Sequence, residues 1–244
     1  MKLTEQDNHY HTAFQKHFNG NPITRDIIEK SFHFAYEMAY GEGFHRNSRS
    51  GGQIARSKSE IFQNTFQGKI AELVLYRNLI KNGIETEEPD CSIHGKGVWD
   101  DSDLKANGKR ISIKSAAYFS NLLLLETKDW DREGRYIPNI DHHDATNAYD
   151  YFVLVRIKPN IKAALKNQSE EKEHLLKKIQ EEVWQYDIAG CCSIKTIQHI
   201  ISLGYILPQN AMLNGRTRMD AENYYIQSVN LFPKEKLYAA LKGI

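Results

Sequence analysis

Two aspartates, a serine and a lysine lie close together in DSDLKANGKRISIKSA, residues 101 to 116. The Asn-Gly dipeptide in the middle of this stretch is a strong signal for a two-residue type I′ hairpin turn. Such a turn places Asp103 opposite Ser112, and it puts Lys114 on the same face because side chains alternate along a strand. A carboxylate that can bind a hard cation and an ammonium that can stabilise negative charge would then lie within reach of one ligand.

The predicted hairpin has two different faces. One is apolar and is expected to belong to the core: Leu104, Ala106, Ile111 and Ile113. The other is charged, and we expect it to have no core to fill: Asp101, Asp103, Lys105, Arg110, Ser112 and Lys114. Lys105 stands opposite Arg110, a like-charge pair that a bound anion would relieve. The alternative interpretation is an amphipathic hairpin whose charged face is only solvated.

A further carboxylate, Glu72, lies in the middle of a helix predicted for residues 59–82. Apolar residues lie on nearly every side of this helix, which predicts that it is largely buried. A buried carboxylate is costly unless it is paired or bound to a metal. Neither Lys69 nor Arg77 sits squarely at i±4 from this glutamate, and Gly68 leaves room for something to approach. A metal site and a structural ion pair are both open at this point.

The remaining pattern predicts the elements that must position these residues. The expected elements are a helix over 24–40 with Thr24 as its N-cap, a left-handed cap at Gly83, a buried strand or helix start at 121–126, a central strand at 149–157 (YDYFVLVRI), a charged helix over 161–186 and a short helix at 193–203. This order predicts an α/β sandwich around a mixed sheet.

Composition narrows the class of protein further. The chain has 244 residues and a formal net charge of +1, so nucleic acid would have to bind in a local basic groove. The glycine-rich segment 41–57 carries Arg46, Arg49 and Arg56, and it can be a phosphate-contacting loop or a solvated linker. No window is apolar enough for a membrane span, no secretory signal begins the chain, and the three cysteines form no CxxC pair. We therefore expect no membrane partner and a cytoplasmic setting.

The hairpin, the helix before it and the strand after it together resemble the PD-(D/E)xK nuclease superfamily. The similarity lies in GKIAELVLYRNLIKNGI, then Asp103, then the Asn-Gly-Lys turn and ISIKSA, with YDYFVLVRI similar to the next sheet strand. It covers about residues 68 to 116 and is greatest to type II restriction endonucleases. The resemblance implies a restriction-endonuclease-like α/β/α core with a central mixed sheet, plus N- and C-terminal helical and loop additions.

The resemblance also implies a division of the chain and a set of roles. Residues 1–244 would form a single nuclease domain, with an N-terminal helical and Arg/Gly loop region (1–58), a catalytic core (59–160) and a C-terminal recognition region (161–244). Mg²⁺ would be held by Asp103, Glu72 and the carbonyl of Ile113, and Lys114 would act on the attacking water. Double-stranded DNA would be the substrate, Arg46, Arg49, Arg56, Lys105 and Arg110 would contact it, and a homodimer would read a palindromic site.

Ser112 departs from the family pattern, which usually has Glu or Asp at this position. Serine is a poorer metal ligand, so another carboxylate would have to replace it. The candidates are Glu72, Asp101 and Glu126, and we favour Glu72 because its helical setting needs a partner. Asp90, which follows a proline, is an alternative to Asp103 as the motif aspartate, although it lies outside the hairpin register.

Three functions therefore follow from the sequence. The first is a Mg²⁺-dependent type II restriction endonuclease. The second is a repair or recombination nuclease that selects DNA by its structure. The third, which Ser112 suggests, is a non-catalytic DNA-binding module on a decayed nuclease scaffold.

Overall fold

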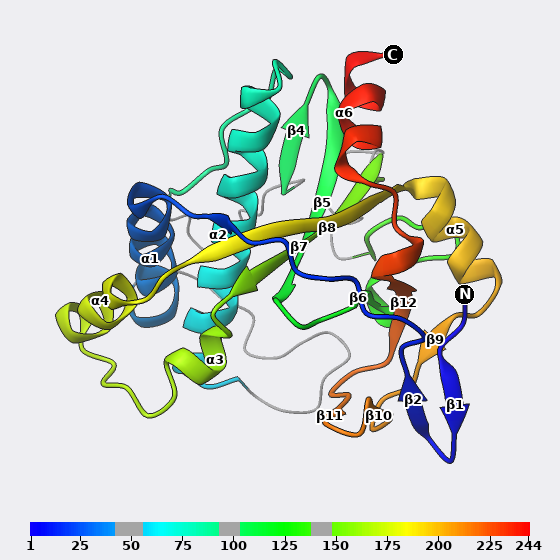
Figure 1. Cartoon of the computed structure of the whole chain (residues 1–244), viewed down its shortest axis with the longest axis horizontal. Coiled ribbons are helices and arrows are strands. Elements are labelled where there is room, and N and C mark those ends of the chain that lie inside the picture. The colour runs from blue at the N-terminus through cyan, green and yellow to red at the C-terminus, as the bar shows by residue number, and fades with distance from the viewer. Residues whose placement is uncertain (42–55, 93–102, 138–147) are drawn as a thin grey trace.

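A five-stranded mixed sheet runs through the middle of the computed structural model, which describes residues 1–41, 56–92, 103–137 and 148–244 (Figure 1). Its strands, in spatial order, are β3 (Asn21–Pro22), β8 (Gln185–Ser193), β7 (Tyr151–Lys158), β5 (Lys109–Ala117) and β4 (Leu104–Ala106). Strands β5 and β7 are parallel, and the other neighbours are antiparallel. The sheet takes strands from all three predicted regions of the sequence. The mixed sheet and the central position of β7 are therefore confirmed.

Helices cover one face of this sheet. They are α1 (Arg25–Tyr40), α2 (Lys58–Lys81), α3 (Ile161–Ala164), α4 (Lys172–Glu181) and α6 (Lys234–Lys242). Their apolar residues form one core cluster with side chains of the sheet such as Ile111, Val153 and Val155. Thr24 precedes α1 as expected, but its hydroxyl accepts a hydrogen bond from Arg77 and makes no cap.

The opposite face is covered by a second, smaller sheet together with one helix. The small sheet has the order β6 (Leu122–Glu126), β12 (Asn223–Gln227) and β9 (Ile206–Leu207), and the helix is α5 (Ile194–Ser202). Their apolar side chains pack against Phe152, Leu154 and Cys192 of the central sheet. The α/β class is confirmed, but helices alone do not cover this face, as the expected α/β/α layering requires.

A third sheet joins the two ends of the chain. Its strands have the order β1 (Thr4–Gln6), β2 (His9–His11), β10 (Met212–Leu213) and β11 (Thr217–Arg218). The β1–β2 and β10–β11 hairpins meet through a parallel pairing of β2 with β10. In Figure 1 this sheet lies at one end of the molecule, beyond β12 and β9.

The region after β7 differs most from the sequence-based expectation. The charged helix predicted over 161–186 is two short helices, α3 and α4, separated by a loop, and the chain already enters β8 at Gln185. β8 was not predicted, because QYDIAGCCS contains few β-branched residues and a glycine. The expected short helix is present as α5. Among the residues that the structure describes, no helix combines the length and the apolar character needed to cross a membrane.

A buried ion pair fixes the N-terminal segment to the sheet. Arg156 of β7 is 1% exposed and binds Asp187 of β8 through two hydrogen bonds of 2.9 and 2.5 Å. The same guanidinium donates to the backbone carbonyls of Lys16 and His17, each at 2.8 Å. Asp187 in turn accepts from the backbone amide of Asn19 at 3.1 Å. This group, which we call the Arg156 clamp, holds residues 16–19 across the sheet.

Candidate functional site

The β4–β5 hairpin has the register that the Asn-Gly turn predicts. Leu104 pairs with Ile111, Lys105 with Arg110 and Ala106 with Lys109. Asn107 and Gly108 have φ values of 45° and 69°, as a type I′ turn requires. The expected hairpin geometry is therefore confirmed.

Asp103, just before β4, reaches across to β5. Its Oδ2 accepts a hydrogen bond from the backbone amide of Ile113 at 2.6 Å and one from the hydroxyl of Ser112 at 3.3 Å. Asp103 itself is half-buried. Its Oδ1 makes no hydrogen bond within the part of the chain that the structure describes. One carboxylate oxygen is thus fixed by the hairpin, and the other is left for a ligand.

The face of β5 that carries Ser112 packs against a hydrophobic core, although the sequence predicted a face without one. Ser112 is 0% exposed and pairs with Phe152 of β7, which is also fully buried. The small sheet, α5 and Trp130 supply the apolar groups that cover this face. The prediction was wrong because these covering elements come from segments whose packing the hairpin sequence does not reveal.

Lys114 follows Ser112 by two residues on the same face and is half-buried. Its Nζ lies 5.7 Å from the centre of the Trp130 ring, within the range of a cation–π contact. Among the described residues no carboxylate forms an ion pair with Lys114. Its ammonium makes no hydrogen bond to the described residues either, so its hydrogens can be donated to a ligand. Trp130 was not predicted as part of the site, and only its place in a polar loop before the central strand could have indicated it.

Glu72 has a partner already. Its carboxylate forms an ion pair with Lys69 at 2.5 Å, and the Lys69 ammonium also donates to the backbone carbonyl of Asp90 at 2.7 Å. Lys69 is 5% exposed and lies 4.4 Å from the ring centre of Phe34. The sequence analysis considered only partners at i±4. The ion pair with Lys69 at i–3 accounts for the partial burial of Glu72 without a metal.

The position of α2 shows on which side of the central sheet Glu72 lies. Strand alternation places Ile111 and Ile113 on the face where α2 packs, and Ser112 and Lys114 on the other. Gln67 of α2 confirms this arrangement, because its amide donates to the hydroxyl of Ser115 at 3.3 Å. The structure thus places Glu72 in a helix on the opposite side of the sheet from Lys114. Its role as a metal ligand stays a prediction.

Two of the other candidate carboxylates, Glu126 and Asp90, lie within the described residues. Asp101 lies outside the described residues. Glu126 ends β6, where Leu123 and Leu125 point to the central sheet, so alternation turns Glu126 away from it. Asp90 lies in a turn, and its Oδ1 accepts from the backbone amide of Ser92 at 2.7 Å. Among the described candidates, neither Glu126 nor Asp90 makes a recorded contact with Asp103.

The predicted DNA-contacting residues are scattered. Arg46 and Arg49 lie outside the described residues, and Arg56 stands just before α2. Lys105 and Arg110 face one another across the hairpin, as the register required. The backbone amide of Arg110 donates to Asp150 at 2.9 Å, and Asp150 also forms an ion pair with Lys109 at 3.0 Å. This end of the hairpin therefore has a carboxylate beside its cations.

A divalent cation would find few protein ligands at this site. Within the described residues, no group of three or more His, Cys, Asp or Glu side chains is arranged to hold a metal. Asp103 offers one carboxylate oxygen, and Mg²⁺ commonly binds through one or two carboxylates while it keeps several waters. The donor set thus fits a hydrated Mg²⁺ shared with a phosphate, and it does not fit a metal enclosed by the protein.

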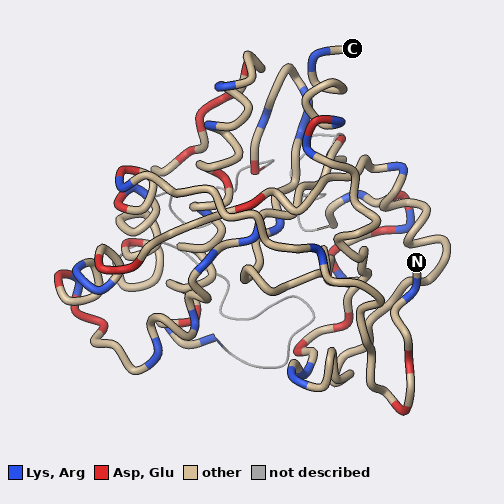
Figure 2. Tube along the Cα trace, in the orientation of Figure 1, with Lys and Arg blue, Asp and Glu red and all other residues tan. Residues whose placement is uncertain are grey.

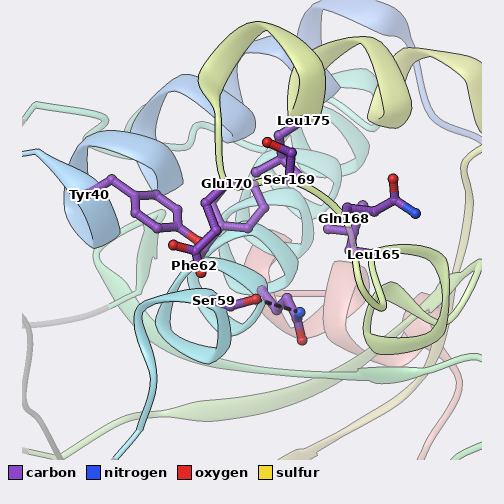
Figure 3. A pocket seen from close by; sticks show the side chains of 9 residues that line it. Tyr40, Ser59, Phe62, Leu165, Gln168, Ser169, Glu170 and Leu175 are labelled. Carbon is purple, nitrogen blue, oxygen red and sulfur yellow. Dashed lines mark hydrogen bonds between the residues drawn. The ribbon is translucent and has the colours of Figure 1, made fainter.

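A small polar pocket lies elsewhere, between α1, α2 and the segment that joins α3 to α4 (Figure 3). Tyr40, Ser59 and Glu170 line it. Burial, together with the charge and hydrogen bond of Glu170, raises the pKa of Tyr40 to about 12. None of the predicted site residues contributes to this pocket.

Comparison with known proteins identifies no relative. No protein-family model matches the sequence, no curated protein matches it, and no solved structure matches the fold.

Proposed function

We propose that the protein is a Mg²⁺-dependent endonuclease of double-stranded DNA with its site on the β4–β5 hairpin. The observation that carries this proposal is the contact of Asp103 with the Ile113 amide, beside a Lys114 that has no ionic partner among the described residues. The order α2, β4, β5 and β7, with β5 parallel to β7, is also the order in which the resemblance to PD-(D/E)xK nucleases places its elements.

Each residue has a distinct part in this proposal. The free oxygen of Asp103 and the carbonyl of Ile113 would hold a hydrated Mg²⁺. When bound, the cation would supply polarisation of the phosphate and a lowered pKa of a water. Lys114 would orient that water and stabilise the negative charge that develops on the phosphoryl oxygens. Ser112 donates to Asp103 and thereby fixes its carboxylate. Glu72, which the sequence predicts as a further metal ligand, is left out of this proposal because it is held in an ion pair with Lys69.

Plasmid digestion tests the proposal. We expect the purified protein to cut supercoiled DNA with Mg²⁺ and to leave it intact with EDTA. Asp103→Asn should reduce the cutting rate by at least about 100-fold, and a Ser112→Ala control should reduce it far less, because the 3.3 Å hydrogen bond is the weaker of the two. Equal cutting by the wild type and Asp103→Asn would refute the proposed site.

The same assay separates the finer alternatives. A type II restriction endonuclease, acting as a homodimer, should give fixed fragments from unrelated plasmids that share one short sequence. A structure-selective nuclease should instead prefer branched or flapped substrates to all linear duplexes.

The burial of Ser112 favours a second candidate, a DNA-binding module without catalysis. An acidic residue at this fully buried position would be costly, so the serine is consistent with a hairpin that no longer carries out hydrolysis. Calorimetric titration with Mg²⁺ distinguishes the two: the module predicts no binding heat that depends on Asp103, and the nuclease predicts one.

A further inference from the structure

The sheet formed by β1, β2, β10 and β11 has one face turned toward the protein and one turned away. Tyr10 is buried and packs with Leu213 in the cluster beneath the sheet. Strand alternation and the observed pairing then assign the outward positions. The outward side chains are those of Thr4, Gln6, His9, His11, Met212 and Arg218.

This outward face carries one arginine, two histidines, two other polar side chains and Met212, and its strands place no carboxylate there. Glu5 points to the other face, where it pairs in register with Tyr10. Asp7 lies in the turn at the end of β1–β2, on the edge of the sheet opposite β11. Asp220 follows β11, is half-buried and has interactions of its own. Figure 2 shows acidic positions on the β1–β2 hairpin, and basic positions near β11 with further acidic positions just after that strand.

The arginines of this hairpin have no partners among the described residues. Arg216, in the loop between β10 and β11, and Arg218 are both exposed, and the side chain of neither makes a hydrogen bond or ion pair there. By contrast, the exposed Arg25 pairs with Glu29, and Arg77 pairs with Asp26. Two guanidinium groups held on a hairpin without a counter-charge are suited to bind anions.

We propose that the outward face of the β1-β2-β10-β11 sheet, with Arg216 and Arg218 at its edge, docks on the phosphate backbone of duplex DNA. The inference deepens the proposed nuclease function, since it rests on DNA as the ligand. The Cα atoms of the arginines are at most about 7 Å apart, so one stretch of backbone can engage both. His9 and His11, exposed on the same face, add hydrogen-bond donors.

The conformation of the loop supports this role. Asn214 and Gly215 have positive φ values of 51° and 65°, which turn the chain tightly and present Arg216 at the tip. The side-chain oxygen of Asn214 accepts from the backbone amide of Thr12 at 3.0 Å, and the backbone amide of Asn214 donates to the carbonyl of Tyr10 at 2.8 Å. The tip is thus held to β2 before any ligand arrives.

Binding to a fluorescent 30-base-pair duplex in EDTA tests the inference without cutting. Each phosphate contact contributes about 0.9 to the slope of log K against log salt concentration. The double variant Arg216→Gln/Arg218→Gln should therefore lower the magnitude of the slope by about 2 and weaken binding by about tenfold or more near 0.1 M salt. A control that removes two exposed helix charges, Lys81→Gln/Lys177→Gln, should leave the slope unchanged. Equal melting temperatures would show that both variants are folded.

The outcomes separate this inference from the proposed nuclease function. An unchanged slope in the arginine variant, with normal binding by the wild type, would overturn the docking face alone. No binding by the wild type even at low salt would overturn both proposals. Arginine-dependent binding without any Mg²⁺-dependent cutting would support the docking face and refute the nuclease.

Discussion

Lys114 and Arg156 project from the same face of the central sheet, on the neighbouring parallel strands β5 and β7. Arg156 pairs in register with Ala116, which is the next residue after Lys114 on this face of β5. Arg156 is 1% exposed and has Asp187 and three backbone carbonyls around its guanidinium. Lys114 is half-buried, and among the described residues its ammonium has a cation–π contact with Trp130 and no ion pair. Within the described part of the chain, one cation thus has a counter-charge and the other does not.

The difference separates a structural group from a candidate functional one. The cost of removing Arg156 from water is offset by its two hydrogen bonds to the Asp187 carboxylate and by those to backbone carbonyls of the N-terminal segment. Lys114 is half-buried and has no counter-charge among the described residues, so a phosphate would complete its surroundings. The same contrast applies to the two aspartates: both oxygens of Asp187 are hydrogen-bonded, whereas one oxygen of Asp103 has no partner in the described part of the chain.

Removal of the clamp should have the largest effect on stability. Arg156→Ala leaves Asp187 buried and unpaired, so we expect the free energy of unfolding to fall by about 3 to 5 kcal/mol in chemical denaturation. Lys172→Ala breaks an ion pair with Glu37 whose side chains are both 43% exposed, and it should cost about 1 kcal/mol or less. Similar losses in the two variants would show that the clamp is not structural.

Glu72 offers a third ion pair, on the other side of the sheet. Glu72→Gln leaves the Lys69 ammonium buried without its counter-charge, so we expect a loss of about 1 to 3 kcal/mol in chemical denaturation. The rate of Mg²⁺-dependent cutting should change little at temperatures where the variant is folded. A large loss of cutting with unchanged stability would reverse this assignment and make Glu72 the missing metal ligand.

The hairpin turn should give the smallest change. Gly108 has φ 69° and open space around it, so Gly108→Ala strains only the backbone and should cost about 1 kcal/mol. Gly68, inside α2, also has open space, and Gly68→Ala should instead stabilise the protein by up to about 1 kcal/mol. Thermal unfolding of the pair measures the difference, and equal shifts would contradict the type I′ turn.

The sequence predicted those parts of the fold that local chemistry determines. The Asn-Gly turn specified the hairpin register, the apolar run YDYFVLVRI identified β7, and periodicity identified α1 and α2. β8 was missed because its burial on both faces comes from packing and not from its own sequence. Strands of two residues, such as β9 and β10, carry too few residues for any periodic pattern.

For the candidate site too, the sequence predicted only the features that the hairpin turn determines. The convergence of Asp103 and Ser112 followed from the turn alone. The burial of Ser112 did not, because it requires the position of the small sheet and of Trp130. The clamp could not be found either, since Arg156 and Asp187 are 31 residues apart and meet only through the register of β7 with β8.

The most direct test of the contrast between the two cations is to measure cutting and stability together in Lys114→Met. Methionine keeps the contact with Trp130 and removes the charge, so the free energy of unfolding should stay within about 1 kcal/mol of the wild type. The rate of Mg²⁺-dependent DNA cleavage should fall by about 100-fold or more. Full cleavage by this variant, or a loss of cleavage that merely follows a loss of folded protein, would contradict the account.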